Sequence, residues 1–215
     1  MATIATYAEG VTLVGGGGLD PADLRLALTL APHLVAADGG ADRLLAEGLL
    51  PDAVIGDMDS LSPEGRTRLG ARVHRIAEQD STDFGKCLAH VTAPFFLGLG
   101  FTGLRADHTL AAFSEIAQQP RTVILMSEDE VIFRAPERFG IDLPLGERLS
   151  IFPFGRVYGT SEGLRWPIDG LVMEPAGRIG TSNAVTGPVR LDLSGPALLL
   201  LPKRNLIRVL GALPH

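Results

Sequence analysis

Aspartates in the first half of the chain carry the clearest chemical signal in this sequence. Six of them lie just after a short apolar run or at the start of the next helix-like stretch, namely Asp38, Asp57, Asp59, Asp80, Asp83 and Asp107. Asp57 and Asp59 are two residues apart, so on an extended segment their carboxylates point the same way. Carboxylates together with substrate phosphates are the ligands that Mg²⁺ usually takes in proteins. We therefore predict a Mg²⁺ site whose ligands are Asp57, Asp59 and Asp83.

Basic side chains near these aspartates are suited to binding phosphate. Lys86 lies one helical turn after Asp83 and could reach a phosphate group, although a simple ion pair with Asp83 explains it equally well. Arg105 lies in a loop between a predicted strand and a predicted helix, where a guanidinium can clamp phosphate oxygens, but a salt bridge is the commoner explanation. His108, beside Asp107, is the only histidine in a comparable position.

Charge is distributed unevenly along the 215 residues, which carry a formal net charge of −6. Residues 1–110 contain 14 acidic and 8 basic residues, whereas the remainder contains 11 of each. This balance argues against a nucleic-acid-binding protein, which would present a basic face. Scattered surface acidity is the alternative to a cation site, and the placement of the aspartates after successive strands favours the cation site.

Several classes of protein are not expected from the composition. No apolar run approaches the length of a membrane span, and the N-terminal residues lack the basic start and apolar core of a signal peptide. We therefore expect a cytoplasmic protein that does not bind membranes. Cys87 is the single cysteine, which excludes an internal disulfide and a thiolate-rich metal site.

Apolar, strand-like runs alternate with helix-like stretches in the first half. The predicted strands are Val11–Val14, Leu34–Ala37, Ala53–Ile55, Val73–Ala77 and Phe95–Leu99. Five strand-then-helix units indicate an α/β domain with a largely parallel sheet and flanking helices. In such a sheet, ligands bind beyond the carboxyl ends of the strands, where the six aspartates would lie.

The pattern changes after about residue 120. Short apolar runs separated by glycine and proline follow, at Val131–Phe133, Leu149–Phe154, Leu171–Met173, Val189–Leu193 and Ala197–Leu201. This spacing predicts an antiparallel β-sandwich. We place the α/β domain at residues 1–125 and the β-sandwich domain at residues 126–215.

Two glycine-rich segments resemble phosphate-binding motifs without matching one fully. Gly15–Gly18 follows the first predicted strand and could let backbone amides approach phosphate, but it lacks the Lys-Ser/Thr of a P-loop, and a tight turn explains it as well. Gly98–Gly103 has the G-x-G-x-x-G spacing of dinucleotide-binding proteins. It occurs in the fifth unit rather than the first, so a nicotinamide or flavin site is not expected.

Six ordered segments, taken together, resemble one family. They are Ala37–Ala41, Gly56–Ser60, Gln79–Leu88, Gly103–His108, Gly163–Ile168 and Thr181–Asn183. In this order, along almost the whole chain, they resemble the segments of thiamine pyrophosphokinases. The sequence departs from that family's pattern at Leu104, where a second glycine usually precedes the arginine.

The resemblance implies a fold, an activity and a set of site residues. The family combines an α/β nucleotide-binding domain with a β-sandwich domain and a homodimeric active site. By position, the implied Mg²⁺ ligands are again Asp57, Asp59 and Asp83. The implied nucleotide and phosphate residues are Asp38, Gly39, Gly40, Lys86, Arg105, Asp107 and His108. The implied thiamine residues are Gln79, Asp80, Trp166, Ser182 and Asn183, although a single Trp in a sandwich is more often a core residue.

The resemblance therefore predicts transfer of pyrophosphate from ATP to the hydroxyl group of thiamine, giving thiamine diphosphate and AMP. Lys86 and Arg105 would stabilise negative charge, and Asp80 or Asp107 would accept the hydroxyl proton. The expected partners are thiamine, ATP and a second copy of the chain. Two alternatives stay open at this point: the same reaction on another heterocyclic alcohol such as a hydroxymethylpterin, and a non-catalytic sensor of nucleotide or thiamine.

Overall fold

The computed structural model describes residues 3–214, which divide into two compact units. The first unit contains the chain up to Glu115 together with Val123–Ser127. The second contains Ile116–Thr122 and the chain from Glu128 onward. Among the helices within residues 3–214, none has the length and apolar character needed to cross a membrane.

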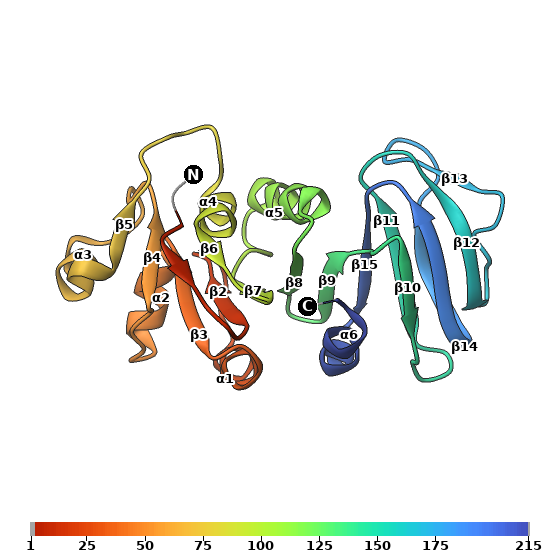
Figure 1. The fold of residues 1–215 in the computed structure, drawn as a ribbon, viewed down its shortest axis with the longest axis horizontal. Coiled ribbons are helices and arrows are strands. Elements are labelled where there is room, and N and C mark those ends of the chain that lie inside the picture. Colours follow the sequence, from red (N-terminus) through yellow and green to blue (C-terminus); the bar gives the residue numbers. More distant parts are fainter. Residues whose placement is uncertain (1–2, 215) are drawn as a thin grey trace. The chain divides into compact units, whose positions relative to one another are not determined.

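The first unit is built on a largely parallel sheet with helices packed around it (Figure 1). Its strands are β1 (Ala5–Thr6), β2 (Val11–Val14), β3 (His33–Ala37), β4 (Ala53–Gly56), β5 (Val73–Arg75), β6 (Val91–Thr92), β7 (Phe95–Leu99) and β8 (Thr122–Met126). Its helices are α1 (Pro21–Leu30), α2 (Gly40–Ala46), α3 (Pro63–Leu69), the 3₁₀ turn η1 (Gly70–Arg72), α4 (Asp83–His90) and α5 (Ala106–Gln118), whose last turn belongs to the second unit. The strands lie in the order β8-β7-β2-β3-β4-β5, while β1 pairs separately with β6.

Strand order creates a switch point in this sheet beside β2. From β2 the chain passes to β3, β4 and β5 on one side, and it later places β7 on the other side of β2. The pairs β2–β3, β3–β4, β4–β5 and β2–β7 are all parallel. The loops that follow β2 and β7 therefore run in different directions from neighbouring strand ends. Such a point is where open parallel sheets leave room for a ligand.

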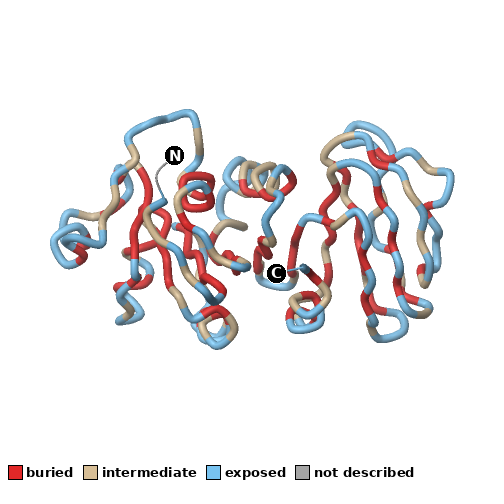
Figure 2. Tube along the Cα trace, viewed as in Figure 1, coloured by how far each residue is buried: buried red, intermediate tan, exposed pale blue. Residues whose placement is uncertain are grey.

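Local sequence explains why these elements form where they do. All four residues of β2 and of β4 are buried, and Figure 2 shows the buried residues concentrated in the strands. The side chains of Asp20, Ser62 and Thr82 cap α1, α3 and α4 by accepting hydrogen bonds from amides of the first helical turn. These caps fix where each helix starts beyond its strand.

The second unit is an antiparallel β domain. Its elements are β9 (Glu130–Arg134), β10 (Arg138–Ile141), β11 (Arg148–Pro153), β12 (Val157–Leu164), β13 (Val172–Met173), β14 (Gly180–Ser194), β15 (Ala197–Pro202), η2 (Lys203–Asn205) and α6 (Leu206–Ala212). β14 pairs with β11 over its first part and with β10 and β12 over its second part. It thereby joins the group β9-β15-β11 to the group β10, β12 and β13.

A buried carboxylate ties the end of the second unit to its strands. Glu147 precedes β11 and is only 4% exposed. Its oxygens accept hydrogen bonds from Arg204 Nε at 2.9 Å and from Asn205 Nδ2 at 3.0 Å. Burial by itself raises the pKa of Glu147, but the hydrogen bonds from Asn205 and Arg204 outweigh it and hold the pKa below its ordinary value.

The prediction of a parallel α/β domain followed by an antiparallel β domain is confirmed. Some elements of the second half have no counterpart among the predicted runs, namely β10, β12, the first part of β14 and α6. The sequence of β12, Val157–Leu164, contains two glycines, a threonine and a serine, and only its two end residues are buried. Its stability as a strand comes from pairing with β14, which no local pattern reveals.

Candidate active site

A pocket of about 680 Å³ lies in the first unit at the carboxyl ends of its parallel strands. Its lining comes from the segments after β2, β3, β4 and β7, from the loop before α4, and from α2, α4 and α5. The residues are Gly15–Gly17, Ala37–Gly39, Asp42, Arg43, Asp57, Ser60, Gln79, Ser81–Phe84, Lys86, Gly100–Arg105, His108, Ala111 and Ala112. This position is the one expected for a ligand site in an open parallel sheet.

The two glycine-rich segments of the sequence meet at this pocket. Gly15 and Gly17 donate backbone hydrogen bonds to Leu99 O and Gly100 O, at 2.8 and 2.9 Å. A Cβ atom on Gly15 or on Gly17 would lie 2.6 Å from Gly100 O, so no side chain fits at either position. Glycine is therefore required for the close approach of the two loops at the switch point.

Three of the six aspartates gather into one group. Asp38, Asp57 and Asp59 each offer a carboxylate oxygen, and these three oxygens lie within 4.8 Å of one another. Asp38 is 3% exposed and accepts a hydrogen bond from Ser60 N through Oδ2 at 3.0 Å. Its Oδ1 is buried and has no hydrogen-bond partner among residues 3–214. A buried acceptor without a donor, beside two further carboxylates, fits a bound cation.

The surroundings of Asp38 are costly for its negative charge. Burial raises the pKa of Asp38 to about 6, and the negative charges of Asp59 and Asp83 add to this rise, while the hydrogen bond from Ser60 N opposes it. Its backbone also lies in the left-handed region, with φ of 42°. Conformational strain and an unfavourable charge are typical of functional sites, and a cation would stabilise the ionised form.

Asp57 carries a carboxylate that is held ionised. Its Oδ2 accepts a hydrogen bond from Gln79 Nε2 at 2.9 Å, and its Oδ1 accepts one from Asp59 N at 3.1 Å. The bond from Gln79 is the main reason that the pKa of Asp57 lies below its ordinary value, and the Asp59 amide adds to it. Gln79, predicted from the family resemblance to contact thiamine, therefore also positions a carboxylate of the group.

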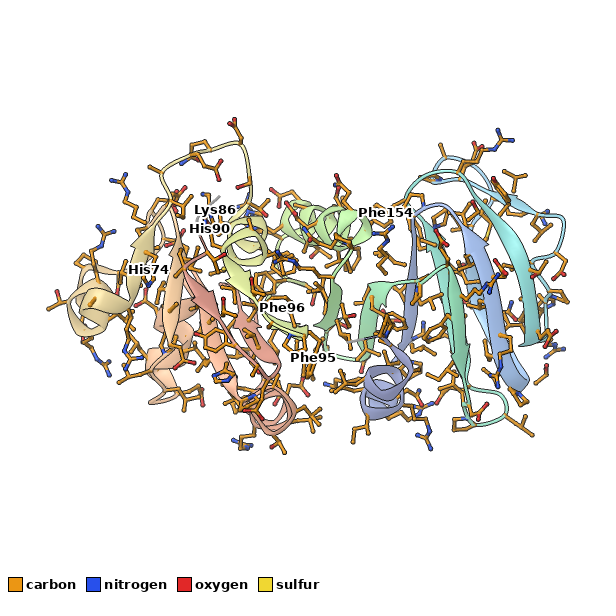
Figure 3. The ribbon with its side chains drawn as sticks, viewed as in Figure 1. His74, Lys86, His90, Phe95, Phe96 and Phe154 are labelled. Carbon is orange, nitrogen blue, oxygen red and sulfur yellow. The ribbon has the colours of Figure 1, made fainter. Side chains whose placement is uncertain are left out.

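Asp83 and Lys86 form an ion pair beside this group. Lys86 Nζ lies 3.1 Å from Asp83 Oδ1 and 3.9 Å from Asp57 Oδ2, and its side chain is 2% exposed. Asp83 Oδ1 also accepts a hydrogen bond from Asp57 N at 3.3 Å. Lys86 lies on α4 (Figure 3), one turn from Asp83, so it both pairs with Asp83 and lines the pocket. The role of Asp83 as a metal ligand stays a prediction.

Arg105 is paired with Asp107 at the rim of the pocket. Arg105 Nε and Nη2 donate to the two carboxylate oxygens of Asp107 at 3.1 and 2.6 Å, and both side chains are exposed. This bidentate bond holds the pKa of Asp107 below its ordinary value. Arg105 and His108 line the pocket, whereas Asp107 and the exposed Asp80 do not.

Leu104 has an unfavourable backbone conformation next to Arg105. It lies in the left-handed region with φ of 46°, and its side chain is 81% exposed. A leucine in this conformation destabilises the folded state by roughly 1–2 kcal/mol. Glycine removes this strain, but its more flexible unfolded chain offsets part of the gain. Leu104→Gly is therefore expected to raise the free energy of unfolding by about 0.5–1 kcal/mol in urea denaturation. Leu104→Ala, which keeps the strain, is the control, and a glycine variant less stable than the alanine variant would contradict this account.

The three predicted thiamine residues of the second half lie together in the second unit. Asn183 is buried and binds both backbone groups of Trp166: its Oδ1 accepts from Trp166 N at 3.1 Å, and its Nδ2 donates to Trp166 O at 2.6 Å. The Trp166 side chain is 54% exposed, so the interpretation as a core residue is wrong. Ser182, beside Asn183, has φ of 60° and donates its backbone N–H to Ser150 Oγ.

Comparison with known proteins assigns the chain to a family. Residues 24–126 match the family model described as thiamin pyrophosphokinase, catalytic domain, and residues 131–198 match the thiamin pyrophosphokinase vitamin B1 binding domain. The chain belongs to the thiamin pyrophosphokinase family. Thiamin pyrophosphokinases are enzymes that transfer pyrophosphate from ATP to thiamine, and the matches favour neither another acceptor nor a non-catalytic sensor.

Individual thiamin pyrophosphokinases are similar to this chain over most of its length. Thiamine pyrophosphokinase 1 of Oryza sativa subsp. japonica is 30% identical over 209 residues, covering 80% of this chain and 79% of the rice protein. Thiamin pyrophosphokinase 1 of Caenorhabditis elegans is 26% identical over 207 residues, covering 85% of this chain and 84% of the nematode protein. The aspartates of the pocket lie within the part that matches the catalytic domain, and Trp166 and Asn183 lie within the part that matches the vitamin B1 binding domain.

Solved structures share the fold. Thiamin pyrophosphokinase from Candida albicans aligns with a TM-score of 0.78 at 18% identity, covering 94% of this chain and 92% of that one. Thiamine pyrophosphokinase from Bacillus subtilis aligns with a TM-score of 0.72 at 21% identity, covering 90% of this chain and 98% of the Bacillus chain. At these identities the alignments establish a common architecture, consistent with the family assignment.

Proposed function

We propose that this chain transfers a pyrophosphoryl group from ATP to the hydroxyl group of thiamine, with the triphosphate bound in the pocket of the first unit. One observation carries the proposal: the pocket is lined by two closely packed glycine loops and by Asp38 and Asp57, two members of the group of three carboxylates that Asp59 completes. Backbone amides of glycine loops can approach phosphate closely, and carboxylates hold the cation that accompanies it. The family assignment supplies the acceptor.

Asp57 and Asp59 are proposed as metal ligands, with Asp38 as the third carboxylate of their group. The buried Oδ1 of Asp38, which lacks a hydrogen-bond partner among the described residues, supports this choice. When bound there, Mg²⁺ would neutralise phosphate charge and polarise phosphoryl oxygens. Asp83, predicted as a ligand from the sequence, is proposed to act beside them by holding Lys86.

The side chains of the pocket would orient the triphosphate and offset the charge that develops during transfer. The thiamine oxygen forms a bond to the β-phosphorus, the bond from that phosphorus to the bridging oxygen of the α-phosphate breaks, and AMP leaves. Lys86 and Arg105 are proposed to stabilise the negative charge. Asp80 and Asp107 are the predicted acceptors of the hydroxyl proton. Arg105 holds the pKa of Asp107 below its ordinary value, which makes Asp107 a poorer proton acceptor.

Further parts of the proposal rest on the family. Trp166, Ser182 and Asn183 are proposed to contact thiamine, since the exposed Trp166 ring suits a flat cationic ring system. The Arg165 guanidinium already lies over this ring, 5.0 Å from its centroid, so thiamine is proposed to use the ring face away from Arg165. Gln79 and Asp80 keep their predicted place among the thiamine contacts, and Gly39, Gly40 and His108 among the nucleotide contacts. We further propose that the protein is cytoplasmic and forms a homodimer. Sedimentation of the purified protein would test the oligomeric state.

Thiamine-dependent release of AMP from ATP is the test of this function. With Mg²⁺ present, AMP and thiamine diphosphate should appear in equal amounts, and removal of divalent cations with EDTA should stop the reaction. Release of ADP instead would exclude pyrophosphoryl transfer. A hydroxymethylpterin that replaces thiamine at higher kcat/KM would support the other acceptor, and tight binding of both substrates without turnover would indicate a sensor.

A further inference from the structure

The basic side chains that line the pocket are not equally available to a ligand. Lys86 is committed to Asp83 and lies near Asp57, and Arg105 donates two hydrogen bonds to Asp107. Arg43 also lines the pocket, and its guanidinium has no ion-pair or hydrogen-bond partner among residues 3–214. Within the described residues, all the N–H donors of the Arg43 guanidinium are therefore available to a ligand in the pocket.

The backbone that carries Arg43 is held firmly at the pocket. Helix α2 begins at Gly40, where a Cβ atom would lie 2.1 Å from Val14 O, so the helix start lies directly against the end of β2. Asp42, the residue before Arg43, accepts hydrogen bonds from Ser62 Oγ at 2.7 Å and from Ser62 N at 2.8 Å. These contacts fix the base of the Arg43 side chain while leaving its guanidinium uncommitted.

The charge of the pocket explains why an uncommitted cation is needed there. Four aspartates line it, Asp38, Asp42, Asp57 and Asp83, and two of the neighbouring basic groups are already paired. A triphosphate approaching such a surface is repelled unless positive charge faces it. A guanidinium meets this need well, because its planar set of donors can bind two phosphate oxygens at once.

We propose that Arg43 binds a phosphate group of ATP and is thereby a substrate-contacting residue of this active site. This inference rests on the proposed function, because it takes the triphosphate of ATP as the ligand of the pocket. It adds a basic side chain from α2 to the nucleotide and phosphate residues implied by the sequence, whose basic members Lys86, Arg105 and His108 come from later segments.

Arg43→Gln and Arg43→Lys test this role, with Arg68→Gln as the matched control. Arg68 is an exposed arginine on α3 that does not line the pocket. Arg43→Gln should raise the KM for ATP by about 10–100-fold and leave the KM for thiamine unchanged, since one charge-assisted contact is lost. The KM of Arg43→Lys for ATP should lie between those of Arg43→Gln and the wild type, because lysine keeps the charge but not the bidentate geometry. Arg68→Gln should resemble the wild type.

Calorimetric binding separates a phosphate contact from a general disturbance of the pocket. Arg43→Gln should weaken ATP binding by about the same factor as it raises KM, whereas adenosine binding should not change, because adenosine has no phosphate. Equal weakening of ATP and adenosine, or no change for ATP, would overturn the proposal. If the wild type binds ATP but forms no AMP, the proposed function fails while the binding comparison still tests Arg43.

Discussion

Asp57→Asn is expected to lower the turnover number of thiamine-dependent AMP formation by on the order of 10³-fold. The substitution keeps the size of the side chain and an oxygen able to accept the hydrogen bond from Gln79. It removes the negative charge from a group in which three carboxylate oxygens lie within 4.8 Å of one another. Because a cation is held chiefly by that charge, metal binding and turnover should fall together while the fold is retained.

Asp129→Asn is the matched control for this substitution. Asp129 is an exposed aspartate of the second unit and does not line the pocket, so its variant should turn over as the wild type does. Initial rates measured over a range of Mg²⁺ concentrations give the comparison. An Asp57→Asn enzyme with the wild-type rate and the wild-type Mg²⁺ dependence would show that Asp57 is not a metal ligand.

Lys86→Met is expected to have the second-largest effect, on both activity and stability. The ammonium of Lys86 is 3.1 Å from Asp83, 3.9 Å from Asp57 and nearly inaccessible to solvent. Methionine keeps much of the apolar stem but leaves the two carboxylates facing each other without the intervening positive charge. The turnover number should fall by about 10²–10³-fold. The free energy of unfolding should fall by about 2–3 kcal/mol, less than for a fully buried pair because Asp83 is partly exposed.

Lys203→Met provides the control, because Lys203 is the second of the two lysines in the sequence and lies in the second unit. Steady-state kinetics should leave this variant close to the wild type. Lys86→Met together with Asp83→Asn should recover part of the lost stability, since removing the nearer unpaired carboxylate relieves the repulsion. A Lys86→Met enzyme with full activity would remove Lys86 from the phosphate-binding residues.

Much of the fold could be predicted from local patterns. The bounds of β2 and β7 coincide with two of the apolar runs found in the sequence, because the burial of short apolar runs is a local property. β10 and β12 could not be found in this way. Both rely on pairing with β14. In β12 the exposed residues Tyr158, Thr160 and Glu162 alternate with half-buried glycine and serine rather than with apolar residues, so no local pattern marks it as a strand.

The sequence by itself determined which groups could do chemistry and that they follow successive strands. The tertiary structure decided which of them meet. Strand order brings the Gly15–Gly17 and Gly100–Gly103 segments together, although neither is a complete phosphate-binding motif alone. In the folded chain Asp38 lies beside Asp57 and Asp59, and Arg105 forms an ion pair with Asp107. Arg43 lines the pocket and has no side-chain partner among the described residues. Such pairings depend on distances between strands far apart in sequence, and these distances are set by sheet order and register rather than by any local residue pattern.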